Sequence, residues 1–418
     1  MKEIRLGDYI DVLTDYHSGG SYKTLKEKTK ILYEPNYAVM IRTLNFENDE
    51  FYKDLIYCDE ASYNFLEYSH VKENDILMNK IANPGSVYIM PKVDYRVTCA
   101  MNLFLLRFKN INQRYIYYVM KNAEQYIKSK AHGTTTKTIT KEEVRNLKFM
   151  IHEKEEEREK IADFFTNIDL KLENNKKIIK ELENYGSTIY SYWFEQFDFD
   201  DEKNNPYKTS DGQMEYNQDI KKEIPKGWKY IPLKTITNQI NGFAFSSDFY
   251  TEDGIYKLYT IKNVQDGCII SKVDNYLNEL PIKMDKECLL KPKDIILSLT
   301  GNVGRTGLVF ENNALLNQRV LKIKENGVSK EFIYFLLRND TMKKRMEKIA
   351  TGTSQKNLSP IQLGELKIIV PDEKVIERFN KKVNGIIDLI VKKYSENEEL
   401  IKLKEKMLPL VMNGQIKF

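Results

Sequence analysis

The stretch VKENDILMNKIANPGSVYI, residues 71–89, decides the fold because it recurs as LKPKDIILSLTGNVGRTGL, residues 290–308. The residues shared by the two stretches stand at a constant offset of 219 positions. The same offset aligns GTTTKTIT, residues 133–140, with GTSQKNLS, residues 352–359. A period of this length is far longer than the repeat of a solenoid. The sequence therefore predicts one globular domain that is present twice in the chain.

Each copy carries a predicted turn between two short apolar segments. In the second copy this turn contains Gly301, Gly304 and Gly307. Their spacing fits neither the phosphate-binding loop G-x-x-x-x-G-K-[ST] nor the dinucleotide pattern G-x-G-x-x-G. The first copy has Ala82 where the second has Gly301, and it has Pro84 two residues later, which a phosphate cradle would not tolerate. We expect a strand-to-strand turn, and contact between its side chains and a ligand remains an open alternative.

A long helical pattern follows each copy. Apolar residues recur at alternating steps of four and three from Ile161 to Trp193 and from Val383 to Val411, which is the a/d spacing of a coiled coil. Either helix would be about 55–60 Å long. Because a lone helix cannot bury its apolar stripe, we expect the two to pair antiparallel. The residues expected in the pairing seam are Ile161, Ile168, Leu172, Asn175, Ile179, Leu182, Ile387, Ile390, Asn397, Ile401 and Leu408.

Asn175 and Asn397 lie near the middle of their seams. Two facing asparagines in a coiled coil can form a polar layer that fixes the register of the helices. A solvated gap at this level is the alternative.

The predicted fold class is α+β, with two repeated globular α/β domains separated by two long helices that form an antiparallel coiled coil. The first domain is expected over 1–150 and the first helical region over 151–195. An aromatic-rich connector, expected to be ordered, covers 196–228. The second domain is expected over 229–370 and the second helical region over 371–418.

Charge is unevenly distributed along the chain, although the net charge is only +4. Residues 100–148 carry ten Lys or Arg against three Glu, and residues 291–367 carry fourteen against seven acidic residues. Residues 151–202 reverse the sign, with fifteen acidic residues against seven basic ones. This pattern favours two surfaces for a polyanion. Ordinary solvated faces are the alternative.

Several classes of function lack support in the sequence. The four cysteines and four histidines are scattered, so neither a disulfide framework nor a metal site is expected. No apolar run approaches the roughly 20 residues of a membrane span, and the charged start lacks a signal peptide, so a cytoplasmic location is predicted. No Ser-His-Asp, H-E-x-x-H or Walker pattern is present. Catalytic, cofactor-binding and metal-binding residues are therefore not expected.

The sequence resembles the DNA-specificity (S) subunits of type I restriction–modification systems over nearly the whole chain. The resemblance is carried by EKIADFFTNIDLKLENNKKIIKELENY (159–185), WFEQFDFDDEKNNPYKTSDGQMEYNQDIKKEIPKGW (193–228) and GTSQKNLSPIQLGELKIIVP (352–371). It implies two target-recognition domains, each reading one half of a bipartite site in double-stranded DNA. It also implies that the helices dock two methyltransferase (M) subunits, joined by a pair of restriction (R) subunits.

By this resemblance the chain is a non-catalytic subunit of an adenine-N6 methyltransferase and restriction endonuclease complex. S-adenosylmethionine, ATP and magnesium would bind to the partner subunits, with no cofactor in this chain. A DNA-modifying enzyme in its own right would need an additional catalytic domain, for which the repeat leaves no room. The remaining alternative is a non-catalytic two-domain scaffold without a DNA role.

DNA contacts are expected from Lys and Arg at phosphates and from Arg, Lys, Asn and Gln at base edges. The candidates in the second copy are Asn302, Arg305, Gln318, Arg319 and Lys356. The candidates in the first copy are Lys80, Asn83, Arg96, Arg107 and Lys137. Because Lys137 and Lys356 match in the repeat, we expect them to bind phosphate, since a shared residue cannot distinguish two different half-sites.

Overall fold

The computed structural model describes residues 1–352 and 355–417 and divides into two compact units. Unit 1 consists of residues 1–171 and 401–418, and unit 2 consists of residues 172–400. Thr353 and Ser354, which belong to the repeated GTSQKNLS stretch, lie outside the described residues. Each unit thus holds one copy of the repeat together with parts of the helical regions.

Two four-stranded sheets form the centre of unit 1, with strand orders β2-β9-β6-β7 and β4-β3-β8-β5. The first sheet is antiparallel throughout, whereas β3 and β8 of the second sheet run parallel. All four residues of the central strand β6 are buried. The strands are β2 (Ile10–Asp15), β9 (Leu103–Phe108), β6 (Ile76–Asn79), β7 (Val87–Ile89), β4 (Tyr57–Cys58), β3 (Ala38–Ile41), β8 (Val97–Cys99) and β5 (His70–Val71).

Unit 2 repeats this topology strand for strand, with the orders β14-β21-β18-β19 and β16-β15-β20-β17. The parallel pair is again present, now between β15 and β20. The duplication predicted from the sequence is therefore confirmed. The strands are β14 (Thr237–Asn241), β21 (Val320–Glu325), β18 (Ile295–Ser298), β19 (Thr306–Leu308), β16 (Tyr276–Leu277), β15 (Tyr256–Tyr259), β20 (Ala314–Leu316) and β17 (Leu289–Leu290).

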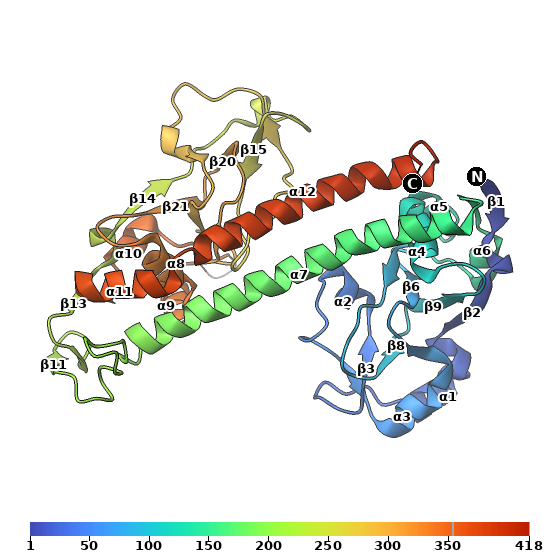
Figure 1. Cartoon of the computed structure of the whole chain (residues 1–418), viewed down its shortest axis with the longest axis horizontal. Helices are drawn as coiled ribbons and strands as arrows, with labels where there is room; N and C mark the ends of the chain where they lie inside the picture. The colour runs from blue at the N-terminus through green and yellow to red at the C-terminus, as the bar shows by residue number, and fades with distance from the viewer. Residues whose placement is uncertain (353–354, 418) are drawn as a thin grey trace. The chain divides into compact units, whose positions relative to one another are not determined.

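Helices and short strand pairs also correspond between the copies (Figure 1). Asn112 caps the amino end of α4, and Ser329 caps that of α8, each by accepting hydrogen bonds from backbone amides. Strand β1 (Lys2–Arg5) pairs with β10 (Lys148–Ile151), as β13 (Lys229–Pro232) pairs with β22 (Lys367–Val370). The helices of the first copy are α1 (Tyr22–Lys28), α2 (Thr43–Glu47), α3 (Glu60–Phe65), α4 (Gln113–Asn122), α5 (Glu124–Ser129) and α6 (Lys141–Asn146). Those of the second are α8 (Lys330–Arg338), α9 (Asp340–Ile349) and α10 (Pro360–Glu365).

The repeated stretch forms the same hairpin in both units. Ile76 pairs with Ile89 across β6 and β7, as Ile295 pairs with Leu308 across β18 and β19. Ala82 takes the left-handed conformation at φ 68°, and Gly301 at the matching position takes φ 76°. The predicted strand-to-strand turn is thus present in both copies, with a similar backbone conformation at the matching position.

The first helical region forms one helix, α7 (Glu155–Phe194), which is 40 residues long. The second region was expected to form one long helix, but it is divided into α11 (Glu373–Val383) and α12 (Ile386–Met412). The break lies at Gly385, whose φ of 79° is left-handed. Such a residue cannot continue a right-handed helix, and glycine tolerates this conformation without steric cost.

The helices pair antiparallel within each unit. In unit 2, the Asn175 amide donates to the Asn397 side-chain oxygen at 2.8 Å, and farther along α7 the ring of Tyr190 meets that of Phe379 at 6.3 Å. The partner number falls as the number along α7 rises, which defines the antiparallel direction. In unit 1, Asp169 of α7 forms an ion pair with Lys404 of α12.

The connector between α7 and β13 is ordered by its aromatic residues. Phe199 stacks on Tyr207 and on Trp228, with ring centroids 4.5 and 5.1 Å apart. Strands β11 (Met214–Asn217) and β12 (Lys222–Pro225) form a short hairpin in the same segment. The aromatic content of this stretch therefore reflects packing within unit 2.

Candidate nucleic-acid interface

Three separate segments meet at one end of the antiparallel sheet in each copy. In the first copy, Lys80 N donates to Asn102 O at 2.9 Å, and Ala82 N donates to Lys137 O at 3.0 Å. We call the surface formed by residues 81–83, 100–102 and 137 the first edge. It joins the turn after β6, the loop between β8 and β9, and the segment before α6.

The second copy builds the matching surface from matching segments. Leu299 N donates to Arg319 O at 2.9 Å, and Gly301 N donates to Lys356 O at 2.9 Å. We call the surface formed by residues 300–305, 317–319 and 356 the second edge. The same backbone hydrogen bonds therefore present different side chains in the two copies.

Most of the predicted DNA-binding residues lie on these two edges. On the first edge, Asn83 and Lys137 are exposed. On the second edge, Arg305 is half-buried. The exposed candidates of the second edge are Asn302, Gln318, Arg319 and Lys356. Residues that are 54 positions apart in the sequence, such as Asn302 and Lys356, thus share one surface.

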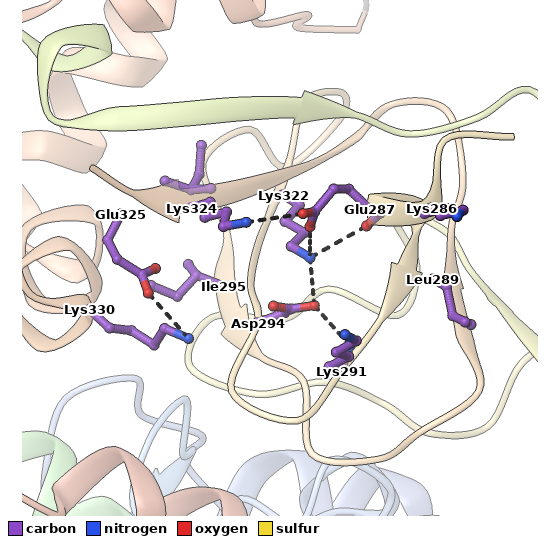
Figure 2. A pocket seen from close by; sticks show the side chains of 11 residues that line it. Lys286, Glu287, Leu289, Lys291, Asp294, Ile295, Lys322, Lys324, Glu325 and Lys330 are labelled. Carbon is purple, nitrogen blue, oxygen red and sulfur yellow. Dashed lines mark hydrogen bonds and ion pairs between the residues drawn. The ribbon is translucent and has the colours of Figure 1, made fainter. Parts of the chain in front are cut away.

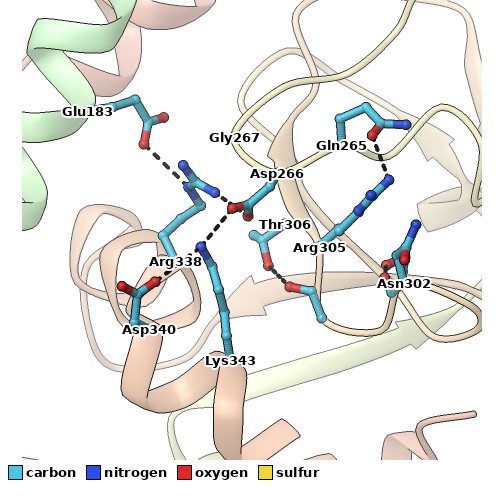
Figure 3. A network of polar contacts seen from close by, with 12 residues as sticks. Glu183, Gln265, Asp266, Gly267, Asn302, Arg305, Thr306, Arg338, Asp340 and Lys343 are labelled. Carbon is cyan, nitrogen blue, oxygen red and sulfur yellow. Dashed lines mark hydrogen bonds and ion pairs between the residues drawn. The ribbon is translucent and has the colours of Figure 1, made fainter. Parts of the chain in front are cut away.

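The two arginines of the second edge differ in what is unusual about them: the side chain of Arg305 is held by hydrogen bonds, and the backbone of Arg319 is left-handed. Arg305 donates to the Gln265 side-chain oxygen at 2.6 Å (Figure 3). The Asn302 amide, with its oxygen toward Arg305, accepts from the guanidinium at 2.9 and 3.2 Å. Arg319 has φ 69°, an uncommon conformation for a residue with a side chain, which is often retained for function. A fixed guanidinium between two amides matches the chemistry that reads base edges.

Lys80 and Arg107 correct the sequence prediction, because both side chains have partners inside the first domain. Lys80 is 7% exposed, and its Nζ lies 2.5 Å from a carboxylate oxygen of Asp15. Burial alone would raise the pKa of Asp15, but the ammonium groups of Lys80 and Lys141 hold it below the usual value. Arg107 donates to both carboxylate oxygens of Asp75, at 2.7 and 2.6 Å. Internal carboxylates therefore neutralise both predicted DNA contacts.

Arg96 is also not on the first edge. It is exposed, and its guanidinium lies 4.5 Å from the centre of the Tyr37 ring. It precedes β8, whereas the edge residues 100–102 follow that strand. Arg96 therefore lies at the opposite end of β8 from the other candidates.

The sequence did not single out a lysine-rich recess of about 240 Å³ in the second copy (Figure 2). Lys322 is buried there, with its Nζ 2.8 Å from Glu287 and 2.9 Å from Asp294. Hydrogen bonds from Lys322 and Lys324 lower the pKa of Glu287 to about 2. Asp294 precedes β18, whereas the second edge follows it. The recess thus lies at the other end of the strand, and its central lysine is neutralised internally.

Each globular domain is joined to α7 through a carboxylate that sequence reasoning missed. In unit 2, Glu183 accepts hydrogen bonds from Tyr334 and from Arg338, the latter at 3.3 Å (Figure 3). Burial raises the pKa of Glu183, and Arg338 opposes this shift. In unit 1, Tyr118 donates to Asp169 at 2.7 Å. In the aligned segments YIYYVMKN and FIYFLLRN, Tyr334 matches Tyr117 rather than Tyr118, so the repeat gives no signal for these junctions.

The expected seam residues differ in burial. Ile401 is 41% exposed, which corrects its assignment to the apolar seam. The seam positions on either side of it, Asn397 and Lys404, form polar contacts with α7, so apolar packing is not continuous there. Leu172, Leu182 and Leu408 are half-buried. The buried members are Ile161, Ile168, Asn175, Ile179, Ile387, Ile390 and Asn397.

Among the residues that the structure describes, no helix has both the length and the apolar composition that a membrane span requires. Within residues 1–352 and 355–417, no group of three or more His, Cys, Asp or Glu is arranged to hold a metal ion.

Comparison with known proteins gives a consistent result. The model of the type I restriction modification DNA specificity domain matches residues 1–184 and 225–404. The specificity subunit of the type I restriction enzyme MjaVIII from Methanocaldococcus jannaschii is 26% identical, over 83% of this chain and 80% of its own length. The HindI specificity subunit from Haemophilus influenzae is 22% identical, over 96% and 99%. The crystal structure of the S subunit from M. genitalium has a similar fold, with a TM-score of 0.58, 17% identity, and coverage of 97% and 94%.

Proposed function

The chain belongs to the family of type I restriction–modification DNA-specificity domains, and we propose that each of its two edges reads one half of a bipartite duplex site. Members of this family determine the DNA target and are the non-catalytic subunits of their complexes. The function of the chain is therefore target recognition, with the chemistry carried out by partner subunits.

The observation that supports the proposed sites is the shared backbone of the two edges. Lys137 and Lys356 occupy matching positions through matching backbone hydrogen bonds. An exposed lysine in this position supplies a charge for a phosphate and carries no sequence information. Around it, the first edge offers Asn83 and Asn102, whereas the second offers Asn302, Arg305, Gln318 and Arg319. Because the two edges share one backbone arrangement but present different side chains, they should select two different half-sites.

The paired helices are the proposed docking site for two M subunits. Large apolar side chains remain exposed on these helices in both units: Leu170 and Leu403 in unit 1, and Leu389 in unit 2. The proposed complex acts in the cytoplasm, with S-adenosylmethionine bound by the M subunits, and ATP and magnesium bound by two R subunits.

A methylation map tests this proposal most directly. The chain is expressed with its methyltransferase partner in a host without adenine methylation, and the modified bases are sequenced. We expect a split motif with two unlike halves and a constant gap between them. A contiguous motif would contradict the assignment of one edge to each half-site.

The scaffold alternative is tested by duplex binding at several salt concentrations. Release of counterions makes phosphate-dependent binding fall steeply as salt rises, with a slope that reports the number of phosphate contacts. A binding signal that does not respond between about 50 and 300 mM salt would favour a scaffold without a DNA role.

A further inference from the structure

A recess of about 440 Å³ opens beside the first edge, entirely within unit 1. Its walls combine the start of α2, strand β3, the turn after β6 and the loop before β9. Asn79 and Leu103 line its inner part, and Asn83, Met101 and Asn102 line its rim. The recess is therefore continuous with the surface that we propose to contact DNA.

Asn79 is the informative residue of this recess. It is 4% exposed, and its side-chain oxygen accepts a long hydrogen bond from Ile81 N at 3.4 Å. Its Nδ2 group donates to no other described residue of the chain. Because its Nδ2 atom is not one of the fully buried side-chain atoms that lack a partner, the amide is accessible from the recess. The recess therefore has an open hydrogen-bonding position at its inner end.

The remaining walls are mixed, because Arg42, Thr43 and Glu47 add polar groups to a lining that is otherwise largely apolar. Met40 and Leu103 are buried, and Ile56 and Ile81 are half-buried. Met101 at the rim is 43% exposed. A small recess with partly apolar walls and an accessible amide donor fits a flat heteroaromatic ring that has a hydrogen-bond acceptor on its edge. A nucleobase has this chemistry.

A base that stays in the stack cannot enter such a recess, because a duplex offers only base edges at the floor of its grooves. We propose that one nucleotide of the first half-site leaves the stack and places its base in this recess, with an acceptor atom toward Asn79 Nδ2. This inference rests on the proposed function of the first edge. It adds that recognition in the first half-site includes an extruded base.

The second copy lacks this open donor. Ser298 stands at the position of Asn79, and its hydroxyl donates to the backbone oxygen of Asn302 at 2.5 Å. Gln318 and Arg319 follow β20 where Met101 and Asn102 follow β8. The second edge is therefore polar at its rim and internally bonded at its floor, so extrusion is expected in the first half-site alone.

The test uses the chain bound to its methyltransferase partner without S-adenosylmethionine, on duplexes carrying the site given by the methylation map. A fluorescent base analogue is moved one position at a time through both half-sites, since an unstacked analogue brightens. A mispair is moved through the same positions in binding assays. A mispair at the extruded base should tighten binding about tenfold, because the pairing energy is no longer lost.

Two variants test whether the fluorescence increase and the mispair effect arise from a base in the recess. Asn79→Leu removes the free donor at similar volume, and Met101→Trp fills the mouth from the exposed rim without changing the core. Both should abolish the bright position and its mispair effect in the first half-site. Ser298→Ala, the matched control in the second copy, should leave that position bright.

The inference would be overturned if the analogue brightened only at the methylated adenines or their partners, and if Asn79→Leu and Met101→Trp left this signal unchanged. The proposed recognition of a bipartite site would still stand. Absence of a split methylation motif would instead contradict the proposed function itself. If Asn79→Leu fails to fold, Met101→Trp alone decides the result, because its site lies on the surface.

Discussion

The two copies of the domain share a framework and differ at the points where they meet other molecules. The sheets have the same strand order, the hairpins have the same register, and the edges are joined by matching backbone hydrogen bonds. The first edge has a recess into which the Asn79 amide opens, and the second has an arginine held between two amides. A framework fixed by buried strands can therefore carry two unrelated sets of surface groups.

The junctions with α7 differ in the same way. Glu183 in unit 2 is 9% exposed and meets Tyr334 and Arg338, whereas the Asp169–Lys404 pair in unit 1 is partly open to solvent. Burial should make the junction in unit 2 the more sensitive one, because an ion pair in water contributes little and a buried charge without its partner is costly.

The largest effects are expected from charges placed in the helix seam of either unit. Ile168 in unit 1 and Ile179 in unit 2 are each 6% exposed. Ile168→Asp or Ile179→Asp should each lower the free energy of unfolding by about 3–5 kcal/mol, because an unpaired carboxylate is buried. The double variant should also lose its M subunits, as measured by co-purification.

Asn174→Asp and Asn184→Asp are the matched controls for these changes, since they add the same charge to exposed positions of α7. Both should keep the M subunits bound. If the double isoleucine variant still co-purified with two M subunits, the helix pair would not be their docking site.

The next effect separates the two junctions. Arg338→Met leaves the buried Glu183 carboxylate without its cation and should lower the free energy of unfolding by about 3 kcal/mol at neutral pH. Lys404→Met, the matched change at Asp169, should cost under about 1 kcal/mol, because that pair is partly exposed. Denaturant unfolding of both variants measures the difference, and equal losses would show that burial does not distinguish the junctions.

The pH dependence of Arg338→Met gives a second measurement. Burial raises the pKa of Glu183 in the folded chain, so the native state binds this proton more tightly than the unfolded state does. The destabilisation should therefore be largest above the raised pKa, and it should shrink as the pH falls toward the usual glutamate value. A loss that stays constant over this interval would mean that Glu183 is not the group left uncompensated.

A smaller effect is expected at the second edge. Arg305→Ala should reduce the discrimination between bases at one position of one half-site by about 1–3 kcal/mol. The other half-site should be unchanged. Gln265→Ala should reduce the same discrimination less, because Gln265 acts through its hydrogen bond to Arg305. Methylation of a duplex library measures both variants. A uniform loss over all positions would assign Arg305 to phosphate contact.

The sequence was sufficient for the parts of the fold that repeat at a constant offset. The hairpin, its turn and most of the helix seam follow from patterns within short stretches, such as the repeat at residues 71–89 and 290–308. The partner of a charge does not follow from such patterns. Asp15 lies 65 residues from Lys80, and Asp75 lies 32 residues from Arg107, so the sequence alone assigned both cations to DNA.

The recess could not be predicted for a related reason. Its walls combine the start of α2 with turns that follow β6 and β8, and the α2 segment has no counterpart among the repeated stretches. The break at Gly385 was missed because glycine also occurs within α7, at Gly186. Gly186 has another role, since a Cβ atom there would lie 2.0 Å from the ring of Phe335.

Substitution of either matched lysine should have the same effect on DNA binding, unlike substitution of the neighbouring side chains that we propose to contact bases. Lys137→Ala and Lys356→Ala should each weaken binding to every duplex sequence and reduce the salt slope by about one. Salt-dependent binding to the specific site and to an unrelated duplex measures this effect. A change confined to the specific site would show that one of these lysines reads a base.

The smallest effect tests the shared turn itself. Ala82→Gly should stabilise the chain by up to about 1 kcal/mol, because glycine adopts a left-handed φ without the steric cost borne by alanine. Gly301→Ala should cost about 1–2 kcal/mol for the same reason. The nearest atom to a Cβ at Gly301 would be 3.9 Å away, so conformation rather than collision sets the loss. Denaturant unfolding should therefore give changes of opposite sign at matched positions, and changes of the same sign would show that the two turns do not share one backbone conformation.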